Sequence, residues 1–436
     1  MARPYNRRHP VRLTKLATLA LSISLFAPVF AAPNAGQMPV WLQAQVQKQP
    51  LLDTLKELVA IESGSGDREG LDRISQLVHD RLKALGGKVE FVEPGEDTYR
   101  MHDTPEKIGR MVRATFTGAG SKKIMLIGHM DTVYLKGMGA KQPFRIDGNK
   151  AYGLGISDDK SGVAVILHTV AALQALNYKD YGTLTVLVNG DEEISSPGSR
   201  ALLTKLGAEH DLTMSFEGSP ANSDQLSLAT AGIAAVTLKV TGRASHAGGA
   251  PERGLNAIYE LAHQMLQTKD FSDAKTGVKM NWTMANGGTN RNVIPAYATA
   301  AADVRVIRVA DYDGLEKKVR ETIKNQLIAD TKVELTFERR RPPLEFKPSQ
   351  LPVTKRAQLI YAEIDKTLGV VETVAGGGTD AAFAALNTPN PVIERFGLLG
   401  FGAHSNDNEY ILIDSIEPRL YLATRLIMDF SRGLVQ

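Results

Sequence analysis

Residues 124–133, with the sequence Ile-Met-Leu-Ile-Gly-His-Met-Asp-Thr-Val, are the stretch from which both the fold and the site can be predicted. Four apolar residues between polar flanks are typical of a buried strand. His129 and Asp131 follow two positions apart, so in an extended chain they point to the same side. Open α/β sheets bind ligands outside the carboxyl ends of their strands. We therefore expect both side chains to face one pocket; the alternative is a satisfied histidine and an aspartate turn after an ordinary strand.

The composition is that of an ordinary soluble globular protein. The chain has 436 residues, of which 43% are hydrophobic and 23% charged, which is enough for two or three domains. The formal net charge is +3, but five positive residues lie within the first 31, and the rest of the chain is near −2. This charge gives no support to a nucleic-acid partner. Because the chain has no cysteine, any metal site would use His, Asp, Glu and water.

Residues 1–31 have the pattern of a secretory signal peptide. Five basic residues and no acidic residue precede an apolar run over residues 16–30. Small residues follow the run at Ala31 and Ala32. The apolar run is short for a membrane anchor, although an uncleaved anchor is the alternative. We therefore expect a periplasmic or secreted protein whose mature form has no membrane segment.

The order of the predicted elements divides the chain into two domains. Strand-like runs alternate with helical patterns in residues 33–224, after a loose leader over 33–50, and this style resumes in residues 343–436. Such alternation predicts an α/β fold with a mostly parallel sheet. Residues 225–342 instead have the order β-α-β-β-α-β, with strands over 232–241, 279–285, 297–306 and 332–338. That order is typical of a ferredoxin-like α+β domain, here inserted into the larger one.

Three of the nine histidines lie in glycine- or serine-rich loops: His129, His246 and His404. Four acidic residues follow predicted strand ends or precede a helix: Asp158, Glu192, Glu193 and Glu217. The adjacent pair Glu192–Glu193 would repel, and a solvated pair is the ordinary alternative. At the end of a buried strand, a cation would relieve the conflict by binding one carboxylate and leaving the other as a base.

Seven motifs occur in order along the chain: HMDTV (129–133), GISDDKSG (155–162), NGDEE (189–193), SFEG (215–218), ASHAG (244–248), RNVIP (291–295) and GAHSNDNE (402–409). Together they resemble the co-catalytic zinc exopeptidases and deacylases, and they are most similar to bacterial glutamate carboxypeptidases of the exported, folate-hydrolysing type. Each motif alone is weak, whereas the ordered set over nearly the whole mature chain is specific.

The resemblance implies two zinc ions per subunit. Asp158 would bridge them, His129 and Glu217 would complete one site, and Glu193 and His404 would complete the other. Glu192 would be the general base, and Asp131 would orient His129. The resemblance also implies a cis peptide bond between Asp158 and Asp159.

For the inserted domain, the resemblance implies dimerisation and residues that reach the neighbouring subunit's site. His246 would stabilise the oxyanion, and Asn292 would contact substrate. Arg305 and Arg341 would grip the substrate carboxylate, since a guanidinium binds carboxylate with two hydrogen bonds. Further donors to the substrate would come from Gly377, Gly378 and Thr379.

We therefore expect a periplasmic, dimeric dizinc metallohydrolase that releases C-terminal glutamate from an N-acyl or folate-type conjugate. An aminoacylase or dipeptidase with the same metal site is the alternative among enzymes. A periplasmic binding or zinc-storage protein is the alternative from another class, and the presence of Glu192 argues against it, because a binding protein needs no base.

Overall fold

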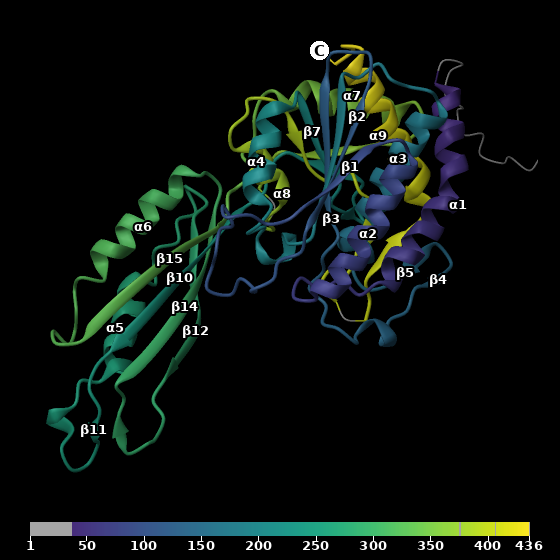
Figure 1. Ribbon diagram of the computed structural model, residues 1–436. Helices are drawn as coiled ribbons and strands as arrows, with labels where there is room; N and C mark the ends of the chain where they lie inside the picture. Colours follow the sequence, from purple (N-terminus) through teal and green to yellow (C-terminus); the bar gives the residue numbers. More distant parts are fainter. Residues whose placement is uncertain (1–36, 375, 406, 436) are drawn as a thin grey trace, which may run out of the picture.

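The predicted strand lies at the centre of a six-stranded sheet in the computed structural model, which describes residues 37–374, 376–405 and 407–435 (Figure 1). The sheet has the order β1-β2-β6-β3-β7-β17. Its strands are β1 (Lys88–Val92), β2 (Met111–Thr117), β3 (Lys123–His129), β6 (Thr183–Asn189), β7 (Leu212–Ser215) and β17 (Val392–Ile393). β3 runs parallel to β6 and β7, and β17 runs parallel to β7. The expected parallel arrangement is therefore confirmed at the centre, while β1 and β2 form an antiparallel margin.

Helices cover β3 on both faces of the sheet. Ile124 and Leu126 belong to a core that includes α1 (Met38–Ala60), α3 (Ser161–Ala175) and α9 (Ile416–Ser431). Met125 and Ile127 belong to a second core, with α4 (Arg200–Glu209) and α8 (Asp380–Ala385). Alternate residues of a strand face opposite sides, so a strand buried on both faces has a continuous apolar run. The larger core also takes in α2 (Arg68–Ala84) and α7 (Gln350–Ala362).

The first helix begins earlier than the sequence pattern predicts. α1 starts at Met38 and contains Pro50, so the expectation of a loose leader over residues 33–50 is wrong for its described part. Pro39 stands in the first turn, where its missing N–H costs nothing. Val40 and Ala44 are buried in the core that α1 shares with α3 and α9, and this packing outweighs the interior proline.

A second, five-stranded sheet was not predicted from the sequence. It has the order β4-β5-β19-β18-β8 and is built from β4 (Arg145–Asp147), β5 (Lys150–Tyr152), β8 (Ser219–Pro220), β18 (Leu399–Phe401) and β19 (Tyr410–Leu412). Strands of two or three residues are too short to carry a readable periodicity. This sheet matters for the site because its strands β18 and β19 flank residues 402–409, and β19 pairs with β5.

The inserted domain is a four-stranded antiparallel sheet with two helices. The sheet has the order β12-β14-β10-β15. Its elements are β10 (Gly232–Thr241), α5 (Ala257–Thr268), β12 (Lys279–Gly287), β14 (Tyr297–Val306), α6 (Ala310–Thr322) and β15 (Lys332–Arg341). Alternate residues of β10 are buried against the helices, as a sheet with one covered face requires. The expected β-α-β-β-α-β order is confirmed, and the domain projects away from the larger one (Figure 1).

The chain enters the inserted domain just after a short contact with the larger one. β9 (Gln225–Ser227) pairs with β16 (Gly369–Val371), and Leu226 and Leu228 lie in the larger core. The signal peptide expected over residues 1–31 lies outside the described residues. Within the described part of the chain, no helix combines the length and the apolar character needed to cross a membrane.

Candidate metal and catalytic centre

His129, the last residue of β3, faces a first group of carboxylates. Its Nε2 lies 3.0 Å from Asp158 Oδ1 and 3.4 Å from Glu217 Oε1, and its side chain is 1% exposed. Burial acts to lower the pKa of the imidazole, but Glu217, Asp131 and Asp158 raise it well above its ordinary value. A single imidazole among several carboxylates thus lies where a cation is strongly favoured.

His404 faces a second group of carboxylates. Its Nε2 lies 3.2 Å from Asp158 Oδ2 and 3.3 Å from Glu193 Oε2. Hydrogen bonds to Asp158 and Glu193 raise the pKa of His404 to about 10, and burial raises the pKa of Glu193 to about 7. The two groups share Asp158, because one of its oxygens faces His129 and the other faces His404.

The donor atoms of both groups fit a pair of divalent cations. Ligand-competent atoms of His129, Asp159 and Glu217 lie within 4.8 Å of one another, and so do those of Asp158, Glu193 and His404. Imidazole nitrogen and carboxylate oxygen are the donors that zinc and similar ions take in sites without cysteine. Asp159 Oδ1 is buried without a hydrogen-bond partner, which adds to the uncompensated negative charge that a cation would balance.

The turn that carries Asp158 is built to fit closely under the sheet. The Asp158–Asp159 peptide bond is cis, as the resemblance implies. Asp159 is fully buried, and a Cβ at Gly162 would lie 2.2 Å from Asp159 Oδ1 and 2.1 Å from the Phe216 carbonyl oxygen. Residue 162 must therefore be glycine for α3 to begin directly below the two ligand groups.

Asp131 contacts more than His129. Its Oδ1 lies 3.4 Å from His129 Nδ1, and its carboxylate accepts the backbone N–H groups of Glu192 at 3.0 Å and Glu193 at 3.1 Å. Ser65 Oγ donates a further hydrogen bond at 2.7 Å. Asp131 thus holds the histidine and the acidic pair in one arrangement, a link that the spacing of residues 129 and 131 gave no means of finding.

Glu192 is held by Arg341, which comes from the end of β15. Arg341 Nη1 lies 2.7 Å from Glu192 Oε1, and Nη2 donates to the Glu192 carbonyl oxygen at 2.6 Å. Arg341 also contacts Asp380 at 3.2 Å and is 4% exposed. Burial raises the pKa of Glu192 well above its ordinary value, while Arg341 acts to lower it. Asp380, to which no role was assigned from the sequence, in turn accepts hydrogen bonds from Asn189 and Ser196.

The other residues expected to bind substrate through the larger domain form contacts within the protein. The Thr379 hydroxyl donates to Glu394 at 2.8 Å and caps α8 by accepting from the Ala381 N–H at 3.2 Å. A Cβ at Gly378 would lie 2.4 Å from Arg341 Cδ, so this glycine permits the close approach of the arginine. The Gly377 carbonyl accepts from the Ala231 N–H at 3.1 Å.

Arg305, on β14, pairs with Asp303 through two hydrogen bonds of 3.0 Å. Its Nη1 donates to the Gly376 carbonyl at 3.1 Å, which connects the inserted domain to the glycine loop.

His246 and Asn292 lie far from both ligand groups within one subunit. His246 ends β11 (Ser245–His246), and Asn292 directly precedes β13 (Val293–Ile294); the two strands form a small ribbon at the distal end of the inserted domain (Figure 1). His246 Nδ1 accepts the N–H groups of Gly248 at 3.1 Å and Gly249 at 2.9 Å. Because Nδ1 accepts these bonds, the ring proton lies on Nε2, which remains a hydrogen-bond donor.

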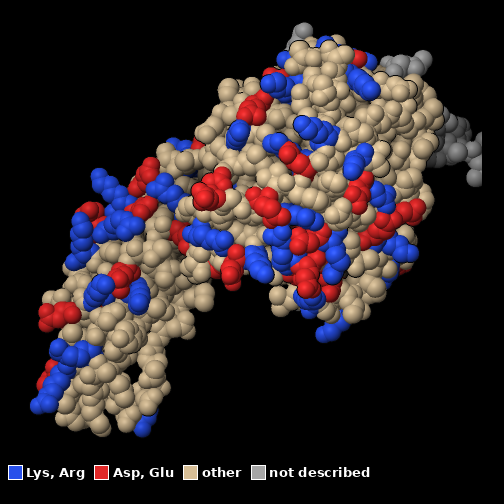
Figure 2. All heavy atoms as spheres, viewed as in Figure 1, with Lys and Arg blue, Asp and Glu red and all other residues tan. Residues whose placement is uncertain are grey.

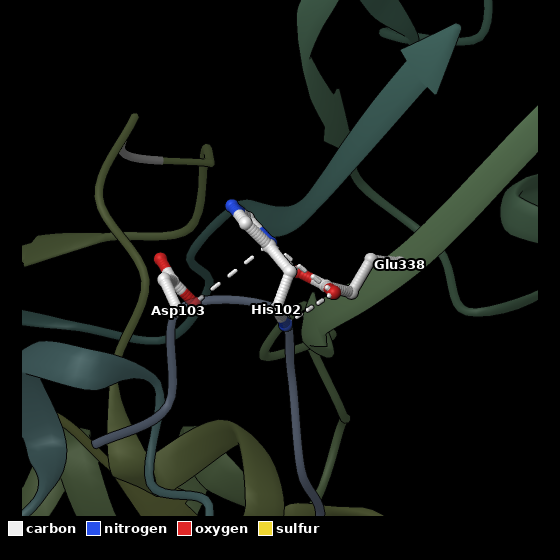
Figure 3. Close-up of side chains that lie close together, drawn as sticks. All are labelled: His102, Asp103 and Glu338. Carbon is white, nitrogen blue, oxygen red and sulfur yellow. Dashed lines mark hydrogen bonds and ion pairs between the residues drawn. The ribbon is translucent and has the colours of Figure 1, made fainter. Parts of the chain in front are cut away.

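A third cluster of metal-competent side chains joins the two domains (Figure 3). His102 contacts Glu338 at 3.0 Å, and Arg340 donates to Asp103 at 3.0 and 2.9 Å and to Glu338 at 2.9 Å. The guanidinium already balances both carboxylates, so this cluster is an ion-pair junction between the loop after β1 and strand β15.

A cavity of about 550 Å³ opens beside the second ligand group. It is lined by residues 64–67 and 132–136 together with Glu193 and Ile194. The cavity is large enough for an organic substrate and brings it next to a predicted ligand.

Two carboxylate–imidazole groups beside the strand ends of an α/β sheet are an arrangement that fits a metal-dependent hydrolase. Comparison with known proteins places the chain within that class. The family described as Peptidase family M20/M25/M40 matches residues 125–429. Carboxypeptidase G2 of Pseudomonas sp. (strain RS-16) is 44% identical over 395 residues, covering 90% of this chain and 92% of that protein. The chain therefore belongs to peptidase family M20/M25/M40, and it is a metallocarboxypeptidase, as its motifs predicted.

More distant relatives also match this chain over most of its length. Acetylornithine deacetylase of Yersinia pestis is 27% identical over 403 residues, covering 87% of this chain and 97% of that protein. An M20 family metallo-carboxypeptidase of Sulfolobus solfataricus has a TM-score of 0.69 at 17% identity, covering 88% of this chain and 99% of its own. Aminopeptidase PepT of Bacillus cereus also has a TM-score of 0.69, at 21% identity, covering 88% of this chain and 98% of its own. These structures confirm the fold.

Proposed function

We propose that this chain is an exported, dimeric dizinc carboxypeptidase that releases C-terminal glutamate from N-acyl or folate-type conjugates. The observation that carries the proposal is the pair of ligand groups sharing Asp158, with Glu192 held beside them. The relation to a glutamate carboxypeptidase over nine-tenths of the chain supports the choice of substrate.

His129 and Glu217 would hold one zinc ion, Glu193 and His404 the second, and Asp158 would bridge them. The bridging role is supported by the two Asp158 oxygens, which face His129 and His404 separately. When bound, the two ions supply Lewis-acid chemistry that polarises the scissile carbonyl and makes water more acidic.

Glu192 is the proposed general base. Its carboxylate would accept a proton from the attacking water and later deliver it to the leaving amine. Asp131 holds the Glu192 backbone N–H, and Arg341 holds the carboxylate, so the base is oriented from two sides. Burial, which raises its pKa, suits a group that must hold a proton between the two steps.

Arg341 and Arg305 are the proposed partners of the substrate carboxylate. Arg341 contacts the proposed base itself and is buried, so a carboxylate bound there would lie next to the reacting bond. Arg305 lies beside the loop of Gly377, Gly378 and Thr379, which would contribute further donors close to that position. Replacing Arg305 with lysine would test this, with a larger effect on KM than on kcat as the supporting result. Replacing Arg341 with lysine should lower kcat as well, because Arg341 also holds the proposed base.

The inserted domain is the proposed dimer interface. β12 is an edge strand, and it carries Met284 at 61% exposure, while α5 exposes Ile258, Tyr259 and Leu266. Figure 2 shows charged side chains over α6, whereas the visible face along β12 is largely uncharged. This distribution of charge favours β12 as the side that contacts a second subunit. An unpaired edge with exposed apolar residues favours pairing with a second copy. The distal ribbon could then bring His246 and Asn292 to the other subunit's site, where His246 Nε2 would donate to the oxyanion.

The test of the reaction is glutamate release from pteroylglutamate by the purified protein, with zinc content measured on the same sample. The proposal expects two zinc ions per subunit, loss of activity on chelation and recovery on adding zinc. Little or no release of glutamate by the zinc-loaded protein would refute the proposed substrate class. Fractionation of cells that express the full chain would test export, with shortened protein in the periplasm or medium as the supporting result.

A second candidate is an aminoacylase or dipeptidase with the same metal site. It is favoured by the 27% identity to acetylornithine deacetylases over 87% of this chain. Rates with N-acyl glutamates and N-acyl neutral amino acids separate the two. Indifference to the acidic side chain would favour the second candidate.

A further inference from the structure

Glu409 ends the motif GAHSNDNE, and neither the metal ligands nor the proposed mechanism uses it. Glu409 directly precedes β19; its side chain is 2% exposed and accepts hydrogen bonds from four donors. Oε1 accepts from the N–H groups of Ser157 at 2.7 Å and Asp158 at 3.1 Å. Oε2 accepts from the Gly155 N–H at 2.8 Å and from the Tyr134 hydroxyl at 2.6 Å.

Three of these donors belong to the turn that carries the shared carboxylate. Gly155, Ser157 and Asp158 lie in the segment that enters α3, and their N–H groups converge on one carboxylate from a different part of the chain. The backbone position of Asp158 decides whether its two oxygens can face His129 and His404 together. Glu409 therefore fixes the backbone from which the shared ligand projects.

The fourth donor leads to the other ligand loop. The Tyr134 hydroxyl is within 3.0 Å of the Ser405 carbonyl oxygen as well as 2.6 Å from Glu409 Oε2. Ser405 follows His404, whose backbone has a φ of 63° in the left-handed region. A residue with a side chain is disfavoured there by roughly 1 kcal/mol or more, so the loop needs support from its neighbours. Tyr134 supplies such support three residues after Asp131.

We propose that Glu409 is a positioning residue that holds the Asp158 turn directly and the His404 loop through Tyr134. An ionised carboxylate suits this role because it only accepts hydrogen bonds and has room for four donors. The inference rests on the proposed dizinc site, and it predicts that the two changes affect the two zinc ions differently. Loss of Glu409 disturbs the shared ligand and so both ions, whereas loss of the Tyr134 hydroxyl disturbs only the ion held by His404 and Glu193.

The test compares Glu409→Gln and Tyr134→Phe with matched changes elsewhere in the same domain. Whichever way the glutamine amide turns, at least one N–H group of the Asp158 turn meets an N–H instead of an acceptor. Tyr421, on α9, donates to Glu363, the residue that follows α7, at 2.5 Å. The changes Tyr421→Phe and Glu363→Gln therefore remove the same kind of bond away from the ligand groups. Zinc affinity of each metal-free protein is measured by titration against a chelator.

Glu409→Gln is expected to weaken binding of both zinc ions by about 10–100-fold, the range found when groups that orient metal ligands are removed. Tyr134→Phe is expected to leave one ion at wild-type affinity and weaken the other by about 10-fold. The two control variants should bind both ions as the wild type does. Cobalt(II) spectra of the loaded proteins should change in the same order.

Amide hydrogen exchange of the metal-free proteins tests whether Glu409 holds the Asp158 turn when no metal is bound. The N–H groups of residues 155–158 should be protected in the wild type and exchange faster in Glu409→Gln, while Glu363→Gln leaves them unchanged. If the wild type binds no zinc, the proposed function fails, and the exchange result alone decides on Glu409. If Glu409→Gln does not fold, exchange in the wild type and zinc affinity of Tyr134→Phe decide.

Wild-type zinc affinity and wild-type exchange in Glu409→Gln would overturn the proposal. Equal weakening of both ions in Tyr134→Phe would overturn the division between the two links. A drop in thermal stability that the control variants share, with no change in zinc affinity, would reduce Glu409 to an ordinary structural residue and also overturn it.

Discussion

The ligand-bearing end of the six-stranded sheet and the distal ribbon of the inserted domain are organised in opposite ways. At the sheet, His129, Asp131 and Glu192 are all less than 10% exposed, and each has at least two partners from other segments. At the ribbon, His246 and Asn292 are exposed, and the His246 ring accepts hydrogen bonds from Gly248 and Gly249 of its own loop. The first region has its proposed metal ligands and base on one chain, whereas the second carries exposed side chains that the proposal assigns to the other subunit's site.

The difference follows from the cost of burying charge. Carboxylates removed from water repel each other strongly, and their protonated forms are favoured, as the raised pKa values of Glu193 and Glu394, about 7 and about 8, indicate. Such a site needs cations and many hydrogen bonds to hold its shape. A neutral histidine on an exposed ribbon needs only a fixed tautomer, which two backbone N–H groups provide.

The sharpest way to break this comparison is Glu192→Gln. If the buried region holds the base, the variant should lose roughly 10³-fold in kcat, within the range for general bases, and keep both zinc ions. Steady-state kinetics and metal analysis of the same sample measure both effects. Arg341 can still donate to the amide oxygen, so the variant should fold.

Substantial activity in Glu192→Gln would show that the base is elsewhere. Full loss of activity together with loss of zinc would mean that Glu192 acts as a ligand instead. If the wild-type protein itself binds zinc but has no hydrolytic activity, it would be a zinc-binding or zinc-storage protein instead of an enzyme.

A smaller but more specific effect is expected at the ribbon. His246→Ala should lower kcat by roughly 10²-fold, as removal of one oxyanion donor does. Mixing this variant with Glu192→Gln, after dissociation and reassociation, should restore about a quarter of wild-type activity, because half of the dimers then contain one intact site. Activity is measured against each variant alone at the same total concentration.

No recovery on mixing would indicate that His246 acts within its own subunit or does not act. A wild-type protein that sediments as a monomer at full activity would contradict the trans arrangement altogether. Either result would remove the proposed reason for the exposed ribbon.

Sequence reasoning found the buried region better than its connections. The apolar run before His129 predicted β3, and its position in the sheet follows from burial on both faces. Contacts such as Asp131 with the Glu192 backbone join residues 61 positions apart, and no local pattern encodes that pairing. The same holds for Arg341: the resemblance implied a contact with the substrate carboxylate, but no local pattern indicated that its guanidinium is buried against Glu192.

The free energy of unfolding of the larger domain should fall in acid because of His168 in α3. Burial lowers the pKa of His168 to about 4, and the neutral ring contacts Thr54 at 2.9 Å and Gln47 at 2.7 Å. The unfolded chain has the ordinary pKa of about 6.5 and takes up this proton first as the pH falls. Stability is therefore full above about pH 6.5 and is lost progressively toward pH 4, by on the order of 3 kcal/mol.

Urea unfolding of metal-free protein at several pH values measures this loss. His168→Gln should be less stable than the wild type at pH 7.5, since it disturbs both hydrogen bonds, but the gap should narrow at pH 5. A gap of constant size across that range would contradict the assignment of the pH dependence to His168.

The smallest expected effect lies at the junction between the two regions. Arg340 joins β15 to Asp103 of the larger domain, whereas the neighbouring Arg339 pairs with Asp313 and Glu316 inside the inserted domain. Both pairs are partly exposed, so replacing either arginine with alanine should cost no more than about 1 kcal/mol of unfolding free energy. Only Arg340→Ala should widen the distribution of interatomic distances in small-angle scattering, because of these two arginines only Arg340 forms its ion pair across the two domains. Identical scattering from the two variants would mean that the Arg340–Asp103 ion pair does not set how the ribbon is presented to a second subunit.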